Sequence, residues 1–212
     1  CFIPIVVPSF FNLFLYSKVY MKVYNSFSFQ LEEFEPINEG KIGMYVCGPT
    51  VYDVPHLGHA RSEVVFDMIR KYLEHKGYEV TYVHNYTDVE DKMIKRANKR
   101  GITVKKLAEE NIKAYEEMQR FLSVKTPTFK PRATEEIEAM IDIVKTLEEK
   151  GYTYEVNGSV YFNTAKMDNY NTFFQRNEKS EEDEEDEFST PEFIGEKKNL
   201  EDFVLWKKKK EG

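Results

Sequence analysis

Two histidines stand three residues apart in His56-Leu-Gly-His59, and this spacing suits phosphate chemistry. An apolar run from Ile42 to Val46, typical of a buried strand, precedes them, and a segment of helical periodicity follows from about Leu57 to His75. Residues three apart in the first turn of a helix share one side, where the helix N-terminus already favours an anion. Rings there can donate hydrogen bonds to phosphate oxygens during nucleotidyl transfer, each worth about 3–4 kcal/mol by analogy with oxyanion-hole donors.

The alternative interpretation is structural: both histidines simply begin a helix, since this short pattern also recurs by chance. The strand before it, Thr50 beside it and the helix after it favour function. Gly58 would let a nucleotide approach the backbone closely, because glycine has no Cβ. We therefore predict that His56 and His59 are catalytic and that Gly58 lies against the nucleotide.

The elements around this segment predict a βαβ unit. Gly77 ends the helix, and Glu79–His84 reads as a second strand parallel to the first, with a right-handed crossover. Asn85-Tyr-Thr-Asp88 then follows at the sheet edge where open α/β folds bind small ligands. Thr87 and Asp88 could instead cap a helix over Val89–Arg100, and both roles can coexist.

Other patterns predict the remaining elements. Alternation between residues 22 and 34 indicates a strand or hairpin, and residues 102–122 and 134–150 have helical periodicity, the second helix starting at Thr134. Asn157-Gly158 predicts a hairpin with a type I′ turn. An apolar stripe on the first helix is expected to be core, namely Val64, Val65, Met68, Ile69, Tyr72 and Leu73.

Composition restricts the class of protein only loosely. The net charge of the 212 residues is −7, and the acidic run Glu181–Glu187 accounts for all seven charges, so the overall charge neither indicates nor excludes a nucleic-acid partner. Two cysteines, Cys1 and Cys47, form no disulfide framework, which favours a reducing, cytoplasmic compartment. We expect no membrane partner, because the apolar stretch near the N-terminus contains prolines and is shorter than the ~20 residues that span a bilayer.

The matches that carry a family resemblance begin with Cys47-Gly-Pro-Thr-Val-Tyr-Asp53 and His56-Leu-Gly-His-Ala-Arg61. Asn85-Tyr-Thr-Asp-Val-Glu-Asp-Lys92, Pro131-Arg-Ala-Thr134 and Asp202-Phe-Val-Leu-Trp-Lys207 follow in order. Together they resemble cysteinyl-tRNA synthetase, a class I aminoacyl-tRNA synthetase. The resemblance implies an α/β fold with a Rossmann-type, parallel-sheet nucleotide-binding core and an α+β insertion.

The resemblance also implies an activity. L-cysteine would attack the α-phosphorus of ATP, supplied with magnesium, and the activated cysteine would pass to tRNA(Cys). No general base is needed, because the attacking carboxylate is already ionised near neutral pH. By resemblance Gly48, Thr50 and Gly58 line the ATP site, and Thr87 contacts cysteine. Cys47 matches one of four ligands of a zinc ion that binds the substrate thiolate and so rejects serine; from the residues alone, a cysteine that ends a strand is a buried apolar residue.

The resemblance has departures. Glu90 and Ser62 replace a usual aspartate and threonine, and the second nucleotide signature (K-M-S-K-S), the other zinc ligands and the anticodon-binding helices are absent from the 212 residues. We therefore expect an incomplete N-terminal part that alone binds ATP weakly at most. The expected division is an upstream, non-native segment or targeting remnant (1–20), half a catalytic domain (21–125), a connective insertion (126–176), an acidic loop (177–198) and the start of the remainder (199–212), with Lys207–Lys210 as a solvated tail.

Two alternatives stay open at the level of sequence. The first is a mycothiol-pathway cysteine ligase, which acylates an amino sugar in place of tRNA. The second is a non-catalytic synthetase remnant that acts as a binding module.

Overall fold

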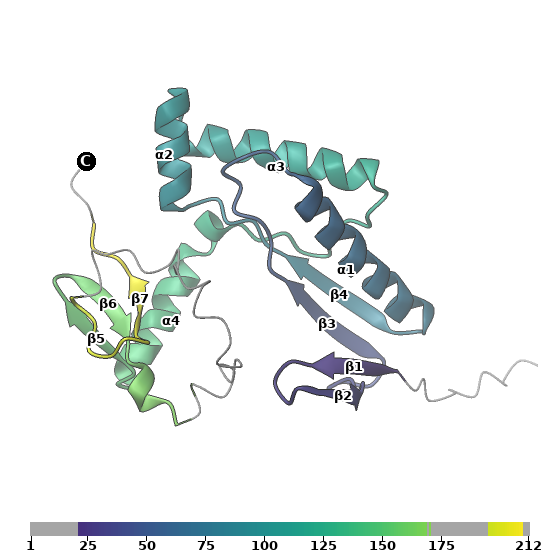
Figure 1. Cartoon of the computed structure of the whole chain (residues 1–212), viewed down its shortest axis with the longest axis horizontal. Coiled ribbons are helices and arrows are strands. Elements are labelled where there is room, and N and C mark those ends of the chain that lie inside the picture. Colours follow the sequence, from purple (N-terminus) through teal and green to yellow (C-terminus); the bar gives the residue numbers. More distant parts are fainter. Residues whose placement is uncertain (1–20, 169, 171–194, 210–212) are drawn as a thin grey trace, which may run out of the picture.

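The structure is a computed structural model that describes residues 21–168, 170 and 195–209 (Figure 1). The predictions for residues 1–20 and for most of the acidic loop lie outside these residues. The described chain begins with β1 (Lys22–Asn25), which pairs antiparallel with β2 (Gln30–Glu33). The predicted hairpin is therefore confirmed.

The central unit has the predicted βαβ order. β3 (Lys41–Val46) pairs in parallel with β4 (Glu79–His84), and the chain between them forms α1 (Leu57–His75). The register sets Val46 beside His84, so the carboxyl ends of both strands meet at one edge. The parallel sheet is confirmed, while a complete Rossmann-type core stays a prediction, since β3 and β4 alone form this sheet among the described residues.

The exposed and buried faces of α1 differ from expectation. Most of the predicted apolar stripe is exposed, namely Val64, Val65, Met68, Ile69 and Tyr72, so the prediction that it is core is wrong for the described part of the chain; only Leu73 is buried. The other buried residues of α1 are Glu63, Asp67 and Arg70. Arg70 Nη1 donates to the Thr126 carbonyl at 2.8 Å, and Asp67 accepts from the Lys125 amide at 2.9 Å. Pairing of this kind makes burial of charge tolerable.

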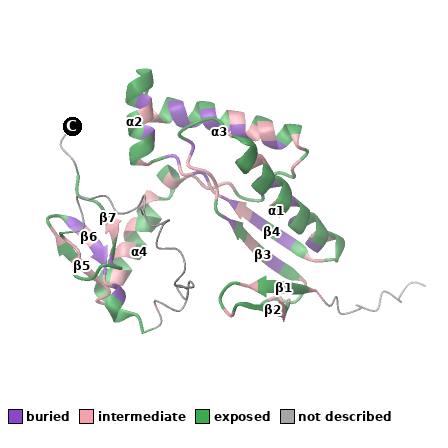
Figure 2. Ribbon diagram, viewed as in Figure 1, coloured by how far each residue is buried: buried purple, intermediate pink, exposed green. Residues whose placement is uncertain are grey.

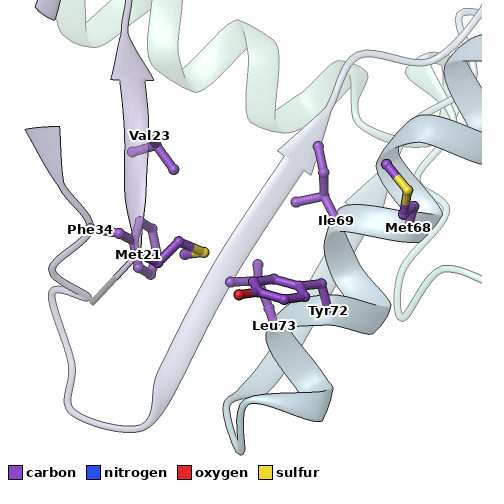
Figure 3. Close-up of a pocket in the computed structure, with 7 residues that line it drawn as sticks. All are labelled: Met21, Val23, Phe34, Met68, Ile69, Tyr72 and Leu73. Carbon is purple, nitrogen blue, oxygen red and sulfur yellow. The ribbon is translucent and has the colours of Figure 1, made fainter. Parts of the chain in front are cut away.

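An apolar pocket lies between the hairpin and α1 (Figure 3). Side chains from the hairpin and from the helix line it, namely Met21, Val23, Phe34, Met68, Ile69, Tyr72 and Leu73. Leu73 also belongs to a small core cluster with Ile42 and Val80. Tyr72 carries the one hydroxyl among these lining side chains and none of them is charged, so the pocket is poorly suited to bind a phosphate.

Residues 128–132, near the start of the expected connective insertion (126–176), run alongside β4. The His84 amide donates to the Phe129 carbonyl at 3.1 Å and the Tyr86 amide to the Pro131 carbonyl at 2.9 Å, both in parallel bridges. Thr128 also exchanges hydrogen bonds with the backbone of Tyr82. Residues 128–132 therefore pair with β4 and its extension through isolated parallel bridges and do not form a regular strand.

Two helices lie beyond the carboxyl ends of β3 and β4 and contribute six of the eight residues of the larger buried hydrophobic cluster. α2 (Asp91–Arg100) packs against α3 (Val104–Phe121), which also contacts α1. One cluster of buried residues joins them to the loop after β3, namely Val51, Tyr86, Met93, Ala97, Leu107, Ala108, Ile112 and Tyr115. Figure 2 shows buried residues alternating along β4 and following one side of α3.

The predicted cap of α2 is wrong. Glu90 occupies the N-cap position and makes no side-chain capping bond. Asp88 instead accepts hydrogen bonds from the amide of Thr134 at 2.9 Å and from its hydroxyl at 2.6 Å. A partner distant in sequence thus takes the carboxylate that local pattern assigned to the helix.

The remaining elements form a sheet beside α4 (Ile137–Glu149). The helix expected from Thr134 starts later, because a 3-10 turn, η1 (Ala133–Glu135), precedes it. β5 (Thr153–Val156), β6 (Ser159–Phe162) and β7 (Phe203–Trp206) pair antiparallel in that order, and η2 (Thr164–Lys166) follows β6. Asn157 and Gly158 both have positive φ, as the predicted type I′ turn requires.

Lys207, the first of the C-terminal lysines, makes a contact that sequence patterns did not predict. Residues 207–209 are exposed, as expected of a solvated tail, and Lys207 Nζ also lies 3.0 Å from Asp91 Oδ2 at the start of α2. In the part of the chain that the structure describes, no helix is both long and apolar enough to cross a membrane.

Candidate active site

The end of β3 closely approaches the segment after β4. The Gly48 amide donates to Asn85 Oδ1 at 2.8 Å, and the Tyr45 hydroxyl donates to the same atom at 3.0 Å. A Cβ on Gly48 would stand 1.5 Å from the Asn85 carbonyl oxygen. Glycine is therefore required here by the protein's own backbone, whereas its contact with a nucleotide stays a prediction.

Thr50 and Thr87 lie opposite one another in a parallel bridge. The Thr87 amide donates to the Pro49 carbonyl at 3.0 Å, and the Val51 amide donates to the Thr87 carbonyl at 3.1 Å. The two threonines that were predicted for different parts of the site thus come from adjacent strand extensions. This pairing continues the parallel register beyond the ends of β3 and β4.

His56 and His59 cap α1 reciprocally. His56 occupies the N-cap, and its Nδ1 accepts the Gly58 amide at 3.0 Å. His59 Nδ1 accepts the His56 amide at 3.1 Å, and the ring centroids lie 4.0 Å apart. A capping box usually pairs Ser or Thr with Glu or Gln, and here two imidazoles fill both places.

This capping decides the tautomer of both rings. A nitrogen that accepts a backbone N–H cannot carry a proton, so in a neutral ring the proton stands on Nε2. Burial lowers the pKa of His59, and His56 lowers it further, while Glu63 opposes both effects. Neutral His59 therefore prevails near pH 7, and each ring has Nε2–H as its hydrogen-bond donor.

Gly58 lies against the ring of His56. A Cβ at this position would stand 2.8 Å from His56 Cε1 and 3.0 Å from Nδ1. The glycine thus makes room for the capping imidazole, a role that the sequence analysis missed. Its predicted approach to a nucleotide is a separate matter and stays a prediction.

Cys47 directly follows β3 and carries a free, exposed thiol. This exposure differs from the buried apolar residue that its position alone suggested. Among the described residues, no three side chains of His, Cys, Asp or Glu gather to hold a metal ion. The described chain therefore offers a single thiol donor, which does not make a four-ligand zinc site.

Two polar contacts anchor the loop between β3 and α1. Asn111 Nδ2 on α3 donates to the Val51 carbonyl at 2.9 Å, in a buried position. Arg96 on α2 pairs with Asp53 at 2.6 Å near the surface. Both fix the loop that leads into the histidines, and their partners are too distant in sequence for local patterns to reveal.

Sequence patterns also did not reveal a buried polar cluster around Glu63, one turn along α1 from His59. Glu63 Oε1 lies 2.9 Å from His84 Nε2, and Glu63 Oε2 accepts from Gln119 Nε2 at 2.9 Å. His84 Nδ1 lies 3.1 Å from the Val46 carbonyl oxygen. Polar residues on otherwise apolar faces were the available signal, but the sequence did not indicate how they pair.

Comparison with known proteins gives a consistent family. Residues 33–212 match the family model described as "tRNA synthetases class I (C) catalytic domain". The chain is 51% identical over 194 residues to a cysteine–tRNA ligase of Caldicellulosiruptor saccharolyticus, covering 91% of this chain and 40% of that protein. A Pyrococcus horikoshii protein of the same name is 50% identical over 193 residues, with the same two shares. The chain thus spans about 40% of the length of these relatives.

A solved structure supports the fold. Mycobacterium tuberculosis methionyl-tRNA synthetase, in complex with methionyl-adenylate, superposes with a TM-score of 0.50 and 24% identity, covering 56% of this chain and 24% of that one. At this identity the likeness shows the fold alone. With the family model matched over most of its length, the chain belongs to the class I (C) tRNA synthetase family, which includes the cysteine–tRNA ligases.

Proposed function

We propose that this chain supplies the ATP- and cysteine-binding edge of a cysteine–tRNA ligase. The observation that carries the proposal is the reciprocal capping of His56 and His59, which leaves Nε2–H as the donor of both rings at a helix N-terminus. The relatives named cysteine–tRNA ligase support the substrate, because they cover 91% of the chain. The protein would activate L-cysteine with ATP and transfer it to tRNA(Cys).

In this proposal the residues act by alignment and charge stabilisation. The cysteine carboxylate attacks the α-phosphorus of ATP and pyrophosphate leaves, while His56 and His59 donate to phosphate oxygens as their negative charge grows. Gly48 and Thr50 line the nucleotide site, and Thr87, bridged to Thr50, contacts the amino acid. Magnesium would accompany ATP and neutralise phosphate charge.

Zinc enters the proposal only through Cys47. Its exposed thiol, next to the strand end, would be one ligand of a zinc ion in a longer protein whose other ligands lie outside the described residues. When bound, zinc would select a thiol over a hydroxyl substrate. An exposed free thiol also fits the reducing cytoplasm that we propose as the location.

The test uses the protein expressed from the reading frame that contains this sequence. We expect ATP–pyrophosphate exchange that requires cysteine and is not supported by serine, together with charging of tRNA(Cys). Charging of an amino sugar in place of tRNA would favour a mycothiol-pathway ligase. Absence of cysteine-dependent exchange would contradict the proposal and favour a non-catalytic binding module.

The 212-residue chain provides a second measurement. We expect calorimetry to detect weak ATP binding at most, and no exchange activity. Measurable cysteine-dependent exchange by this chain would contradict the expectation that it is incomplete.

A further inference from the structure

A buried ion pair joins the helix of the capping histidines to the strand that enters the site. Glu63 lies on α1, one turn after His59, and His84 is the last residue of β4. Their side chains are 2% and 3% exposed, and Oε1 lies 2.9 Å from Nε2. His84 Nδ1 faces the Val46 carbonyl oxygen at 3.1 Å. His84 therefore bridges α1 to the residue just before Cys47.

Both ring nitrogens of His84 face an acceptor. The Val46 carbonyl can only accept a hydrogen bond, so Nδ1 must donate. Nε2 faces the Glu63 carboxylate, in an ion-pair contact that is not aligned as a full hydrogen bond, and it has no other partner among the described residues. The ring of His84 thus lies between the Val46 carbonyl and the Glu63 carboxylate.

Glu63 is also connected to the capping histidines through side chains of α3. Gln119 donates to its second oxygen at 2.9 Å, and the Tyr115 hydroxyl is close enough to the carboxylate to contribute to lowering the pKa of Glu63. Burial opposes ionisation of Glu63, but His84, Gln119 and Tyr115 outweigh it and hold the pKa of this carboxyl below its ordinary value. The ring of Tyr115 packs edge-on against His59, with centroids 5.6 Å apart.

We propose that Glu63 and His84 are positioning residues for the capping histidines His56 and His59. They set the position of the Nε2–H of His59 relative to the end of β3. The chain of contacts runs from the Val46 carbonyl through His84 and Glu63 to Tyr115, whose ring supports His59. The expected effect on catalysis rests on the proposed function, whereas the effect on the His59 ring does not.

Asp67 offers a matched control. It lies one turn further along α1, is buried like Glu63, and is also a paired carboxylate. Its partners are Lys71 and the Lys125 amide, and no contact joins it to either capping histidine. A merely structural role for a buried carboxylate on α1 would make Glu63→Ala and Asp67→Ala equivalent in every readout at the site.

The first experiment records ring ¹H–¹⁵N spectra of the 212-residue chain. We expect a slowly exchanging Nδ1–H signal from His84, and in Glu63→Ala a shift of the ring signals of both His84 and His59. Asp67→Ala should leave both histidines unchanged. Unchanged His59 signals in Glu63→Ala would overturn the proposal. If Glu63→Ala does not fold, Tyr115→Phe serves, since it keeps the ring and removes only the hydroxyl; unmoved His59 signals there would equally overturn it.

The second experiment measures ATP–pyrophosphate exchange by the longer protein. We expect Glu63→Ala to lower kcat about 10–100-fold with KM for ATP little changed, because misplaced donors weaken the transition state more than ground-state binding. Asp67→Ala should keep kcat within about threefold of the unmodified protein. This change is much smaller than the loss of kcat expected from misplaced donors. Equal losses in both variants would overturn the positioning role. An unmodified protein without exchange would instead contradict the proposed function, and the ring spectra alone would then decide the positioning role.

Discussion

The carbonyl oxygen of Asn85 occupies the space where a Cβ of Gly48 would stand, 1.5 Å from its ideal position. The side-chain oxygen of Asn85, Oδ1, also accepts a hydrogen bond from the Gly48 amide at 2.8 Å. Asn85 thus contacts the residue after the end of β3 with both its backbone and its side chain. The close approach brings the chain before the histidines against the chain that carries Thr87.

Gly48→Ala should destabilise the fold. The added methyl group must displace backbone, which we expect to lower the free energy of unfolding by about 1–3 kcal/mol, the usual cost of overpacking. Urea denaturation followed by circular dichroism measures this change. Gly43→Ala, on the preceding strand β3, is the control, since a Cβ there meets nothing within 4 Å. A Gly48→Ala variant as stable as Gly43→Ala would contradict the geometry.

Substitutions at His56 should separate capping from chemistry. His56→Ala removes the acceptor of the Gly58 amide and should cost about 1 kcal/mol of stability, whereas His56→Asn restores an N-cap and should cost little. Both variants lack the Nε2–H donor, so we expect each to lose about 10²–10³-fold in exchange rate in the longer protein. Thermal unfolding and pyrophosphate exchange give the two measurements. Full activity of His56→Asn would show that this ring serves only as a cap.

The depressed pKa of His59 predicts a loss of stability on mild acidification. Burial and His56 lower this pKa in the folded chain, so the unfolded chain binds the proton more readily. The contribution is complete above the unfolded value of about 6.5 and is lost as the pH falls through the folded value. Protonation at Nδ1 also ends its acceptance of the His56 amide.

Urea midpoints between pH 7.5 and 5 measure this loss. His59→Gln is the comparison, since glutamine suits the same capping position and does not titrate. We expect a smaller dependence on pH in His59→Gln than in the unmodified chain. Identical slopes would exclude His59 as the titrating group.

Asp202 should be a major stabiliser of the β5–β6–β7 sheet. Its buried carboxylate accepts from the Thr164 amide and hydroxyl, both at 2.9 Å, and from the Tyr154 hydroxyl at 2.8 Å. Burial raises its pKa, but these bonds outweigh burial and lower it, so the contribution is lost only as the pH falls below the ordinary aspartate value of about 3.9. We expect Asp202→Asn to cost about 1–3 kcal/mol at pH 7, measured by thermal unfolding. The neighbouring exposed residue allows a control, Glu201→Gln, which should be neutral; equal effects would contradict the assignment.

Local pattern predicted the central elements closely. The apolar run, the glycine at its end and the helical periodicity gave bounds that match β3, α1 and β4, because strand and helix signals there agree with the capping and turn residues. The type I′ hairpin was predictable for the same reason, since Asn157-Gly158 tolerates the positive φ that the turn needs.

Pattern failed where a distant partner outweighed a local one. Asp88 looked like a helix cap, yet Thr134 takes its carboxylate. The apolar side of α1 looked like core, yet among the described residues the buried side carries Glu63, Asp67 and Arg70, each paired with groups far along the chain. Hydrophobic periodicity cannot register a charge that becomes buried because it is neutralised.

The sequence by itself determined which residues could do chemistry and the order of strand, histidines and helix, since these depend on neighbours within a few positions. Tertiary structure alone decided the need for glycine at position 48 and the contact between Glu63 and His84. The first follows from a close backbone approach and the second from a buried contact, and in both cases the partners lie more than 20 residues apart in the chain. Only folding fixes such distances.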